Sequence, residues 1–145
     1  MNNQTVDYVV DASVVIQRLI RDTYTVHARA LFDGLDDLTQ IHIPEFCLLE
    51  CTNVLWKEVR FRGMPQSIAE LLIGDLKALP LNIVEVTTVL ERAFEIGLQH
   101  QLAVYDSAYI ALAERLSYPF ITVDQRQERA AAAVGVSLKP VTDFV

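Results

Sequence analysis

Short runs of β-forming residues alternate with longer stretches of helical periodicity along the chain, and this alternation restricts its fold more than any other feature. The strand-like runs cover residues 8–10, 42–43, 82–86 and 118–123, and residues 136–138 are expected to add an edge strand. Helices are expected over residues 13–20, 26–34, 44–62, 65–79, 89–100, 107–116 and 125–134. Strands that alternate with helices in this way build parallel sheets covered on both faces. The sequence therefore predicts an α/β fold, a three-layer α/β/α sandwich with a central parallel sheet of four to five strands.

Proline and glycine mark several of the expected helix ends. Pro44 is expected at the first position of the helix over residues 44–62, where its missing N–H and fixed backbone angle suit a helix start. Gly63 ends that helix, Pro65 opens the next one, and Gly135 stops the alanine-rich helix 125–134. These signals predict the boundaries of three helices.

The length of 145 residues suits one domain, residues 1–145, with a single substantial core. Hydrophobic residues make up 52% and charged residues 21% of the chain, as in ordinary soluble globular proteins. No apolar run approaches the roughly 20 residues that cross a bilayer. The first residues, MNNQTVDYVV, lack the basic region of a signal peptide. We therefore expect a cytoplasmic protein without membrane association.

The net charge of −7 argues against a protein that binds nucleic acid by neutralising many phosphates. It does not exclude an enzyme that meets phosphates through metal ions held by its own carboxylates. Cys47 and Cys51 lie four residues apart in an apolar helical pattern, without the second Cys or His pair that a zinc site needs. They are expected to be buried free thiols.

Two of the expected strands end in an aspartate, because Asp11 follows residues 8–10 and Asp124 follows residues 120–123. In open parallel sheets, ligands bind beyond the carboxyl ends of the strands. Two further acids stand in apolar surroundings, Glu50 within FCLLECTNVLW and Asp106 within LAVYDSAYIALAERL. These four acids are candidates for one site at that edge of the sheet.

Simpler roles exist for each of these acids. Asp11 (or Ser13), Asp106 and Asp124 each precede an expected helix. Their side-chain oxygens could cap these helices by accepting hydrogen bonds from the first N–H groups. Glu50 lies in mid-helix, so its alternative role is an ion pair with a basic residue such as Arg18 or Lys57.

Four acids in one pocket would repel one another and raise one another's pKa. Divalent cations relieve this repulsion, and sites built only from oxygen ligands suit Mg²⁺ or Mn²⁺. The sequence therefore favours a magnesium or manganese site that meets a phosphate.

Four motifs, VVDAS, PEFCLLECTNVLWK, LAVYDSAYIALAERL and FITVDQR, resemble the successive motifs of PIN-domain ribonucleases over nearly the whole chain. The closest likeness is to the VapC-type toxins of toxin–antitoxin pairs. The resemblance implies a PIN-like fold and a Mg²⁺- or Mn²⁺-dependent endoribonuclease that hydrolyses RNA phosphodiester bonds.

The resemblance also assigns residues. The catalytic, metal-binding acids fall on Asp11, Glu50, Asp106 and Asp124, with Asp11 and Asp106 expected as direct ligands. Glu50 is expected to bind a second ion or orient the attacking water, and Asp124 to act directly or through a coordinated water. Supporting hydrogen-bond donors fall on Ser13, Asn53 and Thr122.

Further residues have two interpretations each. Basic side chains near the acids either position the RNA backbone or form a solvated helix face; they are Arg18, Arg21, Lys57, Arg60 and Arg62. Tyr105 and Tyr109 either stack bases or pack in the core, and core packing is favoured. The resemblance implies a homodimer and a small VapB-like antitoxin, for which the apolar helix within residues 67–79 and its neighbours could supply a surface.

Three other functions remain as alternatives. A haloacid-dehalogenase-like phosphatase needs a second Asp at the position where Ser13 stands. A response-regulator receiver needs an acidic pair before its first helix, and no such pair adjoins Asp11. A PIN-like module without catalytic activity should have lost some of its acids, and none is missing here.

Overall fold

The computed structural model describes residues 4–145. Its strands are β1 (Val6–Val10), β2 (Thr39–Pro44), β3 (Leu81–Val84) and β4 (Phe120–Ile121). Its α-helices are α1 (Ala12–Leu19), α2 (Thr25–Asp33), α3 (Phe46–Arg62), α4 (Gln66–Ala78), α5 (Leu90–His100), α6 (Val104–Leu116) and α7 (Gln125–Val134). Two short 3₁₀ helices, η1 (Thr87–Val89) and η2 (Val141–Asp143), complete the described elements.

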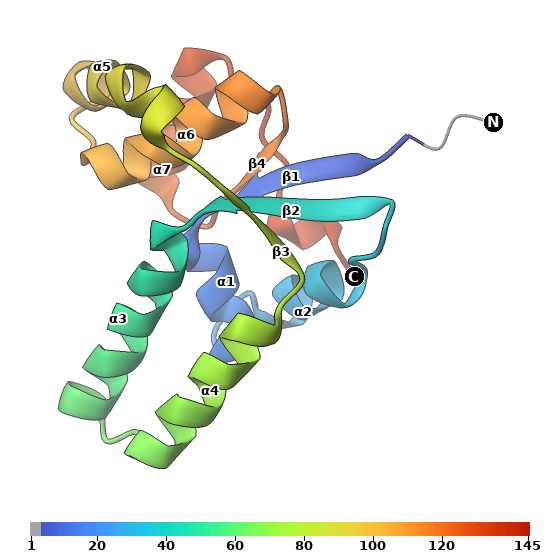
Figure 1. The fold of residues 1–145 in the computed structure, drawn as a ribbon, viewed down its shortest axis with the longest axis vertical. Coiled ribbons are helices and arrows are strands. Elements are labelled where there is room, and N and C mark those ends of the chain that lie inside the picture. The colour runs from blue at the N-terminus through green and yellow to red at the C-terminus, as the bar shows by residue number, and fades with distance from the viewer. Residues whose placement is uncertain (1–3) are drawn as a thin grey trace.

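The strands form one parallel sheet in the order β3-β2-β1-β4. Figure 1 shows α5, α6 and α7 on one side of this sheet and α1 and α2 on the other, with α3 and α4 as a long helical hairpin extending from that second side. The predicted three-layer α/β/α fold with a central parallel sheet is confirmed.

The register of β1 and β4 brings two distant segments side by side. Val9 pairs with Phe120 and Val10 with Ile121, and all four residues are fully buried because helices cover both faces of the sheet. The next residue on each strand is polar, Asp11 after Val10 and Thr122 after Ile121. The parallel register therefore places these two side chains next to each other at the carboxyl edge.

The predicted position of Pro44 is wrong by two residues. Pro44 is the last residue of β2, where it pairs with Val84, and α3 begins only at Phe46. The fixed backbone angle of proline is compatible with an extended strand end as well as with a helix start, so the residue itself did not decide between them. The glycine signals hold, since Gly63 and Gly135 both adopt a left-handed conformation after α3 and α7.

Two other boundaries differ from the prediction. Helix α6 begins at Val104, three residues earlier than expected, so Asp106 lies inside its first turn and Ala103 occupies the capping position. The segment 136–138 contributes only one isolated bridge, between Leu138 and Phe120, in place of a strand.

The turn between α5 and α6 depends on Gly97. A Cβ atom at this position would lie 2.7 Å from the carbonyl oxygen of Leu102 and 3.3 Å from the hydroxyl of Ser107. Glycine therefore permits the close approach of α5 to the segment that starts α6, the helix that carries Asp106.

Cys47 and Cys51 are buried free thiols, as predicted. Within residues 4–145, none of the helices combines the length and the apolar character needed to cross a membrane.

Candidate active site

The four predicted acids come from four different elements and line one pocket of about 350 Å³. Asp11 follows β1, Glu50 lies in the second turn of α3, Asp106 lies in the first turn of α6, and Asp124 precedes α7. Ser13, Asn53, Lys57 and Tyr109 line the same pocket. Residues separated by more than a hundred positions are thus brought to the carboxyl edge of the sheet.

Asp11 is the most deeply buried of the four acids. Its side chain is 4% exposed, and two hydroxyl groups donate to it: Ser13 Oγ to Oδ1 over 2.6 Å, and Thr122 Oγ1 to Oδ2 over 3.1 Å. Burial raises its pKa to about 7, the two hydrogen bonds oppose this, and the negative charge of Asp124 adds to it. Asp11 occupies the capping position of α1 without a side-chain hydrogen bond of capping geometry, although the nearby N–H of Val14 also lowers its pKa.

Glu50 is held by a tyrosine and not by a cation. Tyr109 Oη donates to Glu50 Oε1 over 2.6 Å. Burial raises the pKa of Glu50, the Tyr109 hydrogen bond lowers it, and the charge of Asp106 raises it further. Among the residues described here, neither Arg18 nor Lys57 forms an ion pair with Glu50, so the alternative of a simple salt bridge is wrong.

Tyr109 itself is almost completely buried and packs edge-on against Phe46. Burial raises its pKa, so the phenol stays protonated and acts as a donor. The burial of Tyr109 agrees with the favoured core role, but its hydrogen bond to Glu50 was not predicted from the sequence.

Asp106 and Asp124 differ in their hydrogen bonding. Burial raises the pKa of Asp106, the charge of Asp124 also raises it, and nearby Arg126 lowers it. The capping role expected of Asp106 is wrong, because the residue lies within the helix. Asp124 does cap its helix, since Oδ1 accepts from the N–H groups of Arg126 and Gln127 over 2.8 and 3.2 Å.

The predicted supporting residues lie beside these acids. Ser13 also accepts the N–H of Val123 over 3.2 Å, and Thr122 accepts the N–H of Asp124 over 3.0 Å, so both hydroxyls tie the end of β4 to the end of β1. Asn53 lies one turn after Glu50 on α3 and lines the pocket with its side chain exposed.

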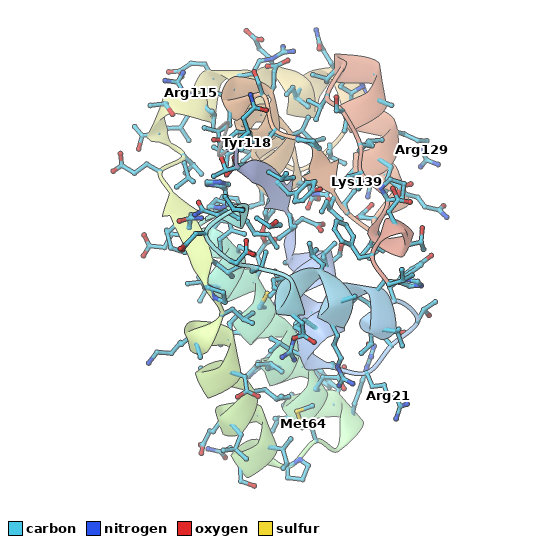
Figure 2. The ribbon with its side chains drawn as sticks, turned by 90° about the vertical axis from the view of Figure 1, so that its right-hand side faces the viewer. Arg21, Met64, Arg115, Tyr118, Arg129 and Lys139 are labelled. Atoms are coloured by element: carbon cyan, nitrogen blue, oxygen red, sulfur yellow. The ribbon has the colours of Figure 1, made fainter. Side chains whose placement is uncertain are left out.

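The basic residues separate into two groups. Lys57 lines the acid pocket, whereas Arg18, Arg21 and Arg60 are not among the side chains that line it. Arg60 lies over the ring of Phe61 at 5.1 Å, and Figure 2 shows Arg21 projecting outward at the surface. Arg126, which lowers the pKa of Asp106, was not considered from the sequence.

Gln127 is a second residue that sequence reasoning missed. It is buried on α7, its Oε1 shares the hydroxyl hydrogen of Thr122 with Asp11, and its Nε2 donates to the carbonyl of Asp106. A signal was present: Gln127 stands at the start of a helix face that continues with Ala130, Ala131 and Val134, where an apolar residue is the norm.

The donor set fits a hard divalent cation. Every acidic side chain in the pocket offers oxygen, and three of these acids have a raised pKa that a cation would lower. Among residues 4–145, no group of three or more Asp, Glu, His or Cys side chains is placed so that it could hold a metal ion by itself. Mg²⁺ does not require such a group, because it keeps several waters and commonly uses one or two carboxylates plus substrate phosphate.

Comparison with known proteins agrees with this arrangement. The chain is 29% identical over 122 residues to ribonuclease VapC3 of Pyrobaculum aerophilum, covering 81% of this chain and 89% of that protein. Its fold matches the crystal structure of PAE2754 from the same organism, with a TM-score of 0.73, 20% identity and coverage of 97% and 94% of the two chains.

A second fold match is VapC20 of Mycobacterium tuberculosis, described as a toxin that cleaves the sarcin–ricin loop, with a TM-score of 0.65 and 14% identity. It covers 89% of this chain and 95% of that one. The model of the PIN domain family matches residues 8–133, a span that includes all four acids. With its predicted motifs and fold both found, this chain belongs to the PIN domain family.

Proposed function

We propose that this protein is a Mg²⁺- or Mn²⁺-dependent endoribonuclease and acts as the toxin of a VapBC-type toxin–antitoxin pair. The observation that carries the proposal is the convergence of Asp11, Glu50, Asp106 and Asp124 on one pocket. Membership of the PIN domain family and the similarity to a ribonuclease support RNA as the substrate.

Asp11 and Asp106 would hold the metal ion, with Glu50 and Asp124 holding a second ion or a coordinated water. When bound, such an ion would neutralise charge at the scissile phosphate and acidify an attacking water. In-line attack by water would leave a 5′-phosphate and a 3′-hydroxyl.

The chain's own residues prepare the site for this chemistry. Ser13 and Thr122 fix the carboxylate plane of Asp11, and Tyr109 fixes Glu50. Since the pKa of Asp11 is about 7, part of the metal-free protein carries a protonated Asp11 at neutral pH, and metal binding would release that proton. Lys57 at the pocket wall would attract the RNA phosphate.

Cleavage of RNA by the purified protein tests this proposal. Wild type should cleave single-stranded RNA with Mg²⁺ or Mn²⁺ and lose activity in EDTA. Asp106→Asn should reduce cleavage by at least about a hundredfold, in line with the loss of a major electrostatic contact. Asp75→Asn, an exposed change of the same charge on α4, is the matched control and should cleave like wild type. Equal cleavage by Asp106→Asn and Asp75→Asn would exclude the proposed site.

The two alternative functions, a phosphatase and a binding module without catalytic activity, predict different results in this cleavage experiment. A phosphatase would hydrolyse p-nitrophenyl phosphate and leave RNA intact. A binding module without catalytic activity would bind RNA without metal-dependent cleavage. The presence of all four acids in one pocket favours the nuclease over the inactive module.

The homodimer is the second part of the proposal, and an exposed apolar stripe supports it. Leu90, Phe94 and Leu98 stand four residues apart on α5 and are about half exposed or more. Val104 and Tyr105, at the start of α6, are exposed as well. Large exposed apolar patches are typical of protein interfaces. We propose that two copies associate through this stripe, and Phe94→Glu should then yield a monomer in light scattering, whereas Leu71→Glu on α4 should remain dimeric.

The proposed antitoxin surface is a separate apolar groove between α3, α4 and β3. Its volume is about 790 Å³, and the lining includes Leu48, Ile73, Leu76 and Ile83. A groove of this kind suits the apolar face of an amphipathic segment. Basic residues on that segment would complement the net charge of −7. A cognate VapB-like antitoxin should copurify with wild type and inhibit cleavage, and Ile73→Asp should weaken that complex while cleavage persists.

A further inference from the structure

Gln127 is an amide buried where an apolar side chain would normally lie. It is 1% exposed, and the other buried residues of α7 are Ala130 and Ala131. Burying an amide costs free energy unless its oxygen and nitrogen are both hydrogen-bonded. A methionine of similar length would fill the same space without that cost, so core packing alone does not account for glutamine here.

The contacts of Gln127 lead to three of the four acids. Its side-chain Oε1 lies 2.9 Å from Thr122 Oγ1, whose one hydroxyl hydrogen is shared between this oxygen and Asp11 Oδ2 at 3.1 Å. Its Nε2 lies 3.3 Å from the carbonyl oxygen of Asp106 and 3.5 Å from Asp106 Oδ1. Its backbone N–H donates to Asp124 Oδ1 over 3.2 Å.

The orientation of this amide is fixed by its partners. The carbonyl of Asp106 can only accept a hydrogen bond, so the amide nitrogen must face it and the oxygen must face Thr122. The amide thus forms a bridge from the end of β4 to the first turn of α6. No other element ties Asp106 to the strand end that holds Asp11 among the hydrogen bonds of residues 4–145.

We propose that Gln127 is a positioning residue, which sets the distance and orientation of Asp106 relative to Asp11 and Asp124 for metal binding. This inference rests on the proposed metal-dependent function. Glu50 lies outside the bridge, because its hydrogen bond comes from Tyr109 and not from Gln127. The site is therefore supported by two buried side chains with separate tasks, an amide that links Asp106 to Thr122 beside Asp11, and a phenol that holds Glu50.

The experiment compares Gln127→Met with Gln17→Met. Gln17 is also buried and accepts the N–H of Tyr24 over 2.9 Å, but it lies on α1 and does not line the acid pocket. Mn²⁺ binding is measured on the full chain without RNA, by calorimetry or electron paramagnetic resonance, together with thermal unfolding of the metal-free protein.

Gln127→Met should weaken Mn²⁺ binding about tenfold to a hundredfold, as expected when a partner that orients a metal ligand is removed. Gln17→Met should lower the unfolding temperature without changing Mn²⁺ affinity. Thr122→Val removes the other end of the bridge. The double variant should therefore lose less Mn²⁺ binding free energy than the sum of the losses in Gln127→Met and Thr122→Val.

Wild-type affinity in Gln127→Met would overturn the inference, and so would an equal loss of affinity in Gln17→Met, because general destabilisation would then explain it. If Gln127→Met fails to fold, Thr122→Val alone decides, and unchanged Mn²⁺ binding in that variant counts against the bridge. A wild-type protein that binds Mn²⁺ but cleaves no RNA would contradict the proposed function and leave this inference standing. A wild type that binds no Mn²⁺ would contradict both.

Discussion

Tyr109 on α6 donates its hydroxyl hydrogen to Glu50 on α3 over 2.6 Å, across 59 positions of sequence. This contact joins two helices that flank the acid pocket and gives a half-buried glutamate a neutral partner. The hydrogen bond lowers the pKa of Glu50, against burial and the charge of Asp106, which both raise it.

Tyr109→Phe should therefore raise the pKa of Glu50 further. Because a carboxylate must be ionised to bind a metal or to orient water, the acidic limb of the pH–rate profile should move to higher pH. Stability should fall by about 1–2 kcal/mol through the lost hydrogen bond. Steady-state cleavage across pH checks this, with Tyr118→Phe, a half-buried tyrosine outside the pocket, as the control. An unchanged profile would mean that the phenol only packs.

Asp11 predicts a pH dependence of stability in metal-free buffer. Its pKa is about 7 in the folded protein, above the usual value of 3.8, so the folded state holds this proton more tightly than the unfolded state. The stabilisation that the folded state gains from this raised pKa is complete below pH 4 and is lost as pH rises from about 4 to about 7. Relative to wild type, Asp11→Asn should gain stability over this range, at a rate approaching about 1.4 kcal/mol per pH unit. Urea denaturation of both proteins in EDTA measures the difference, and a constant difference would contradict the raised pKa.

Asp124 combines a helix cap with a place in the acid pocket, and two substitutions separate these roles. Asp124→Asn keeps an oxygen for the N–H groups of Arg126 and Gln127 and should preserve stability, while cleavage drops through the lost charge. Asp124→Ala should lower cleavage and also cost about 1 kcal/mol of stability. If both variants cleave RNA like wild type, Asp124 is a cap and nothing more.

Gly97 predicts a steric effect on the helix that carries Asp106. Gly97→Ala would place a Cβ atom 2.7 Å from the Leu102 carbonyl, so the turn must shift at a cost of about 1–3 kcal/mol. Gly74→Ala on α4 is the matched control: a Cβ there meets nothing within 4 Å, and alanine should stabilise the helix by up to about 1 kcal/mol. Chemical denaturation compares the two, and equal effects would show that the turn tolerates a side chain.

Local patterns in the chain were enough to predict many of its elements. Helix α7 has the expected bounds because Asp124 can accept its first N–H groups and Gly135 can adopt the left-handed end. Pro44 was misplaced because proline suits a strand end as well as a helix start, and only its pairing with Val84 decides. The start of α6 was missed because Ala103 caps it without any polar side chain to mark the position.

The sequence by itself determined the α/β class, the order of strands and helices, and the identity of four acids in motifs typical of PIN domains. These follow from periodicity and residue type, which are local properties. The tertiary structure decided that Tyr109 holds Glu50 and that Gln127 links Asp106 to Thr122. Such partners are set by the register of parallel strands and by the angle at which helices pack. Strand register and helix packing angle cannot be read from the spacing of residues, because each depends on segments that meet only when the chain is folded.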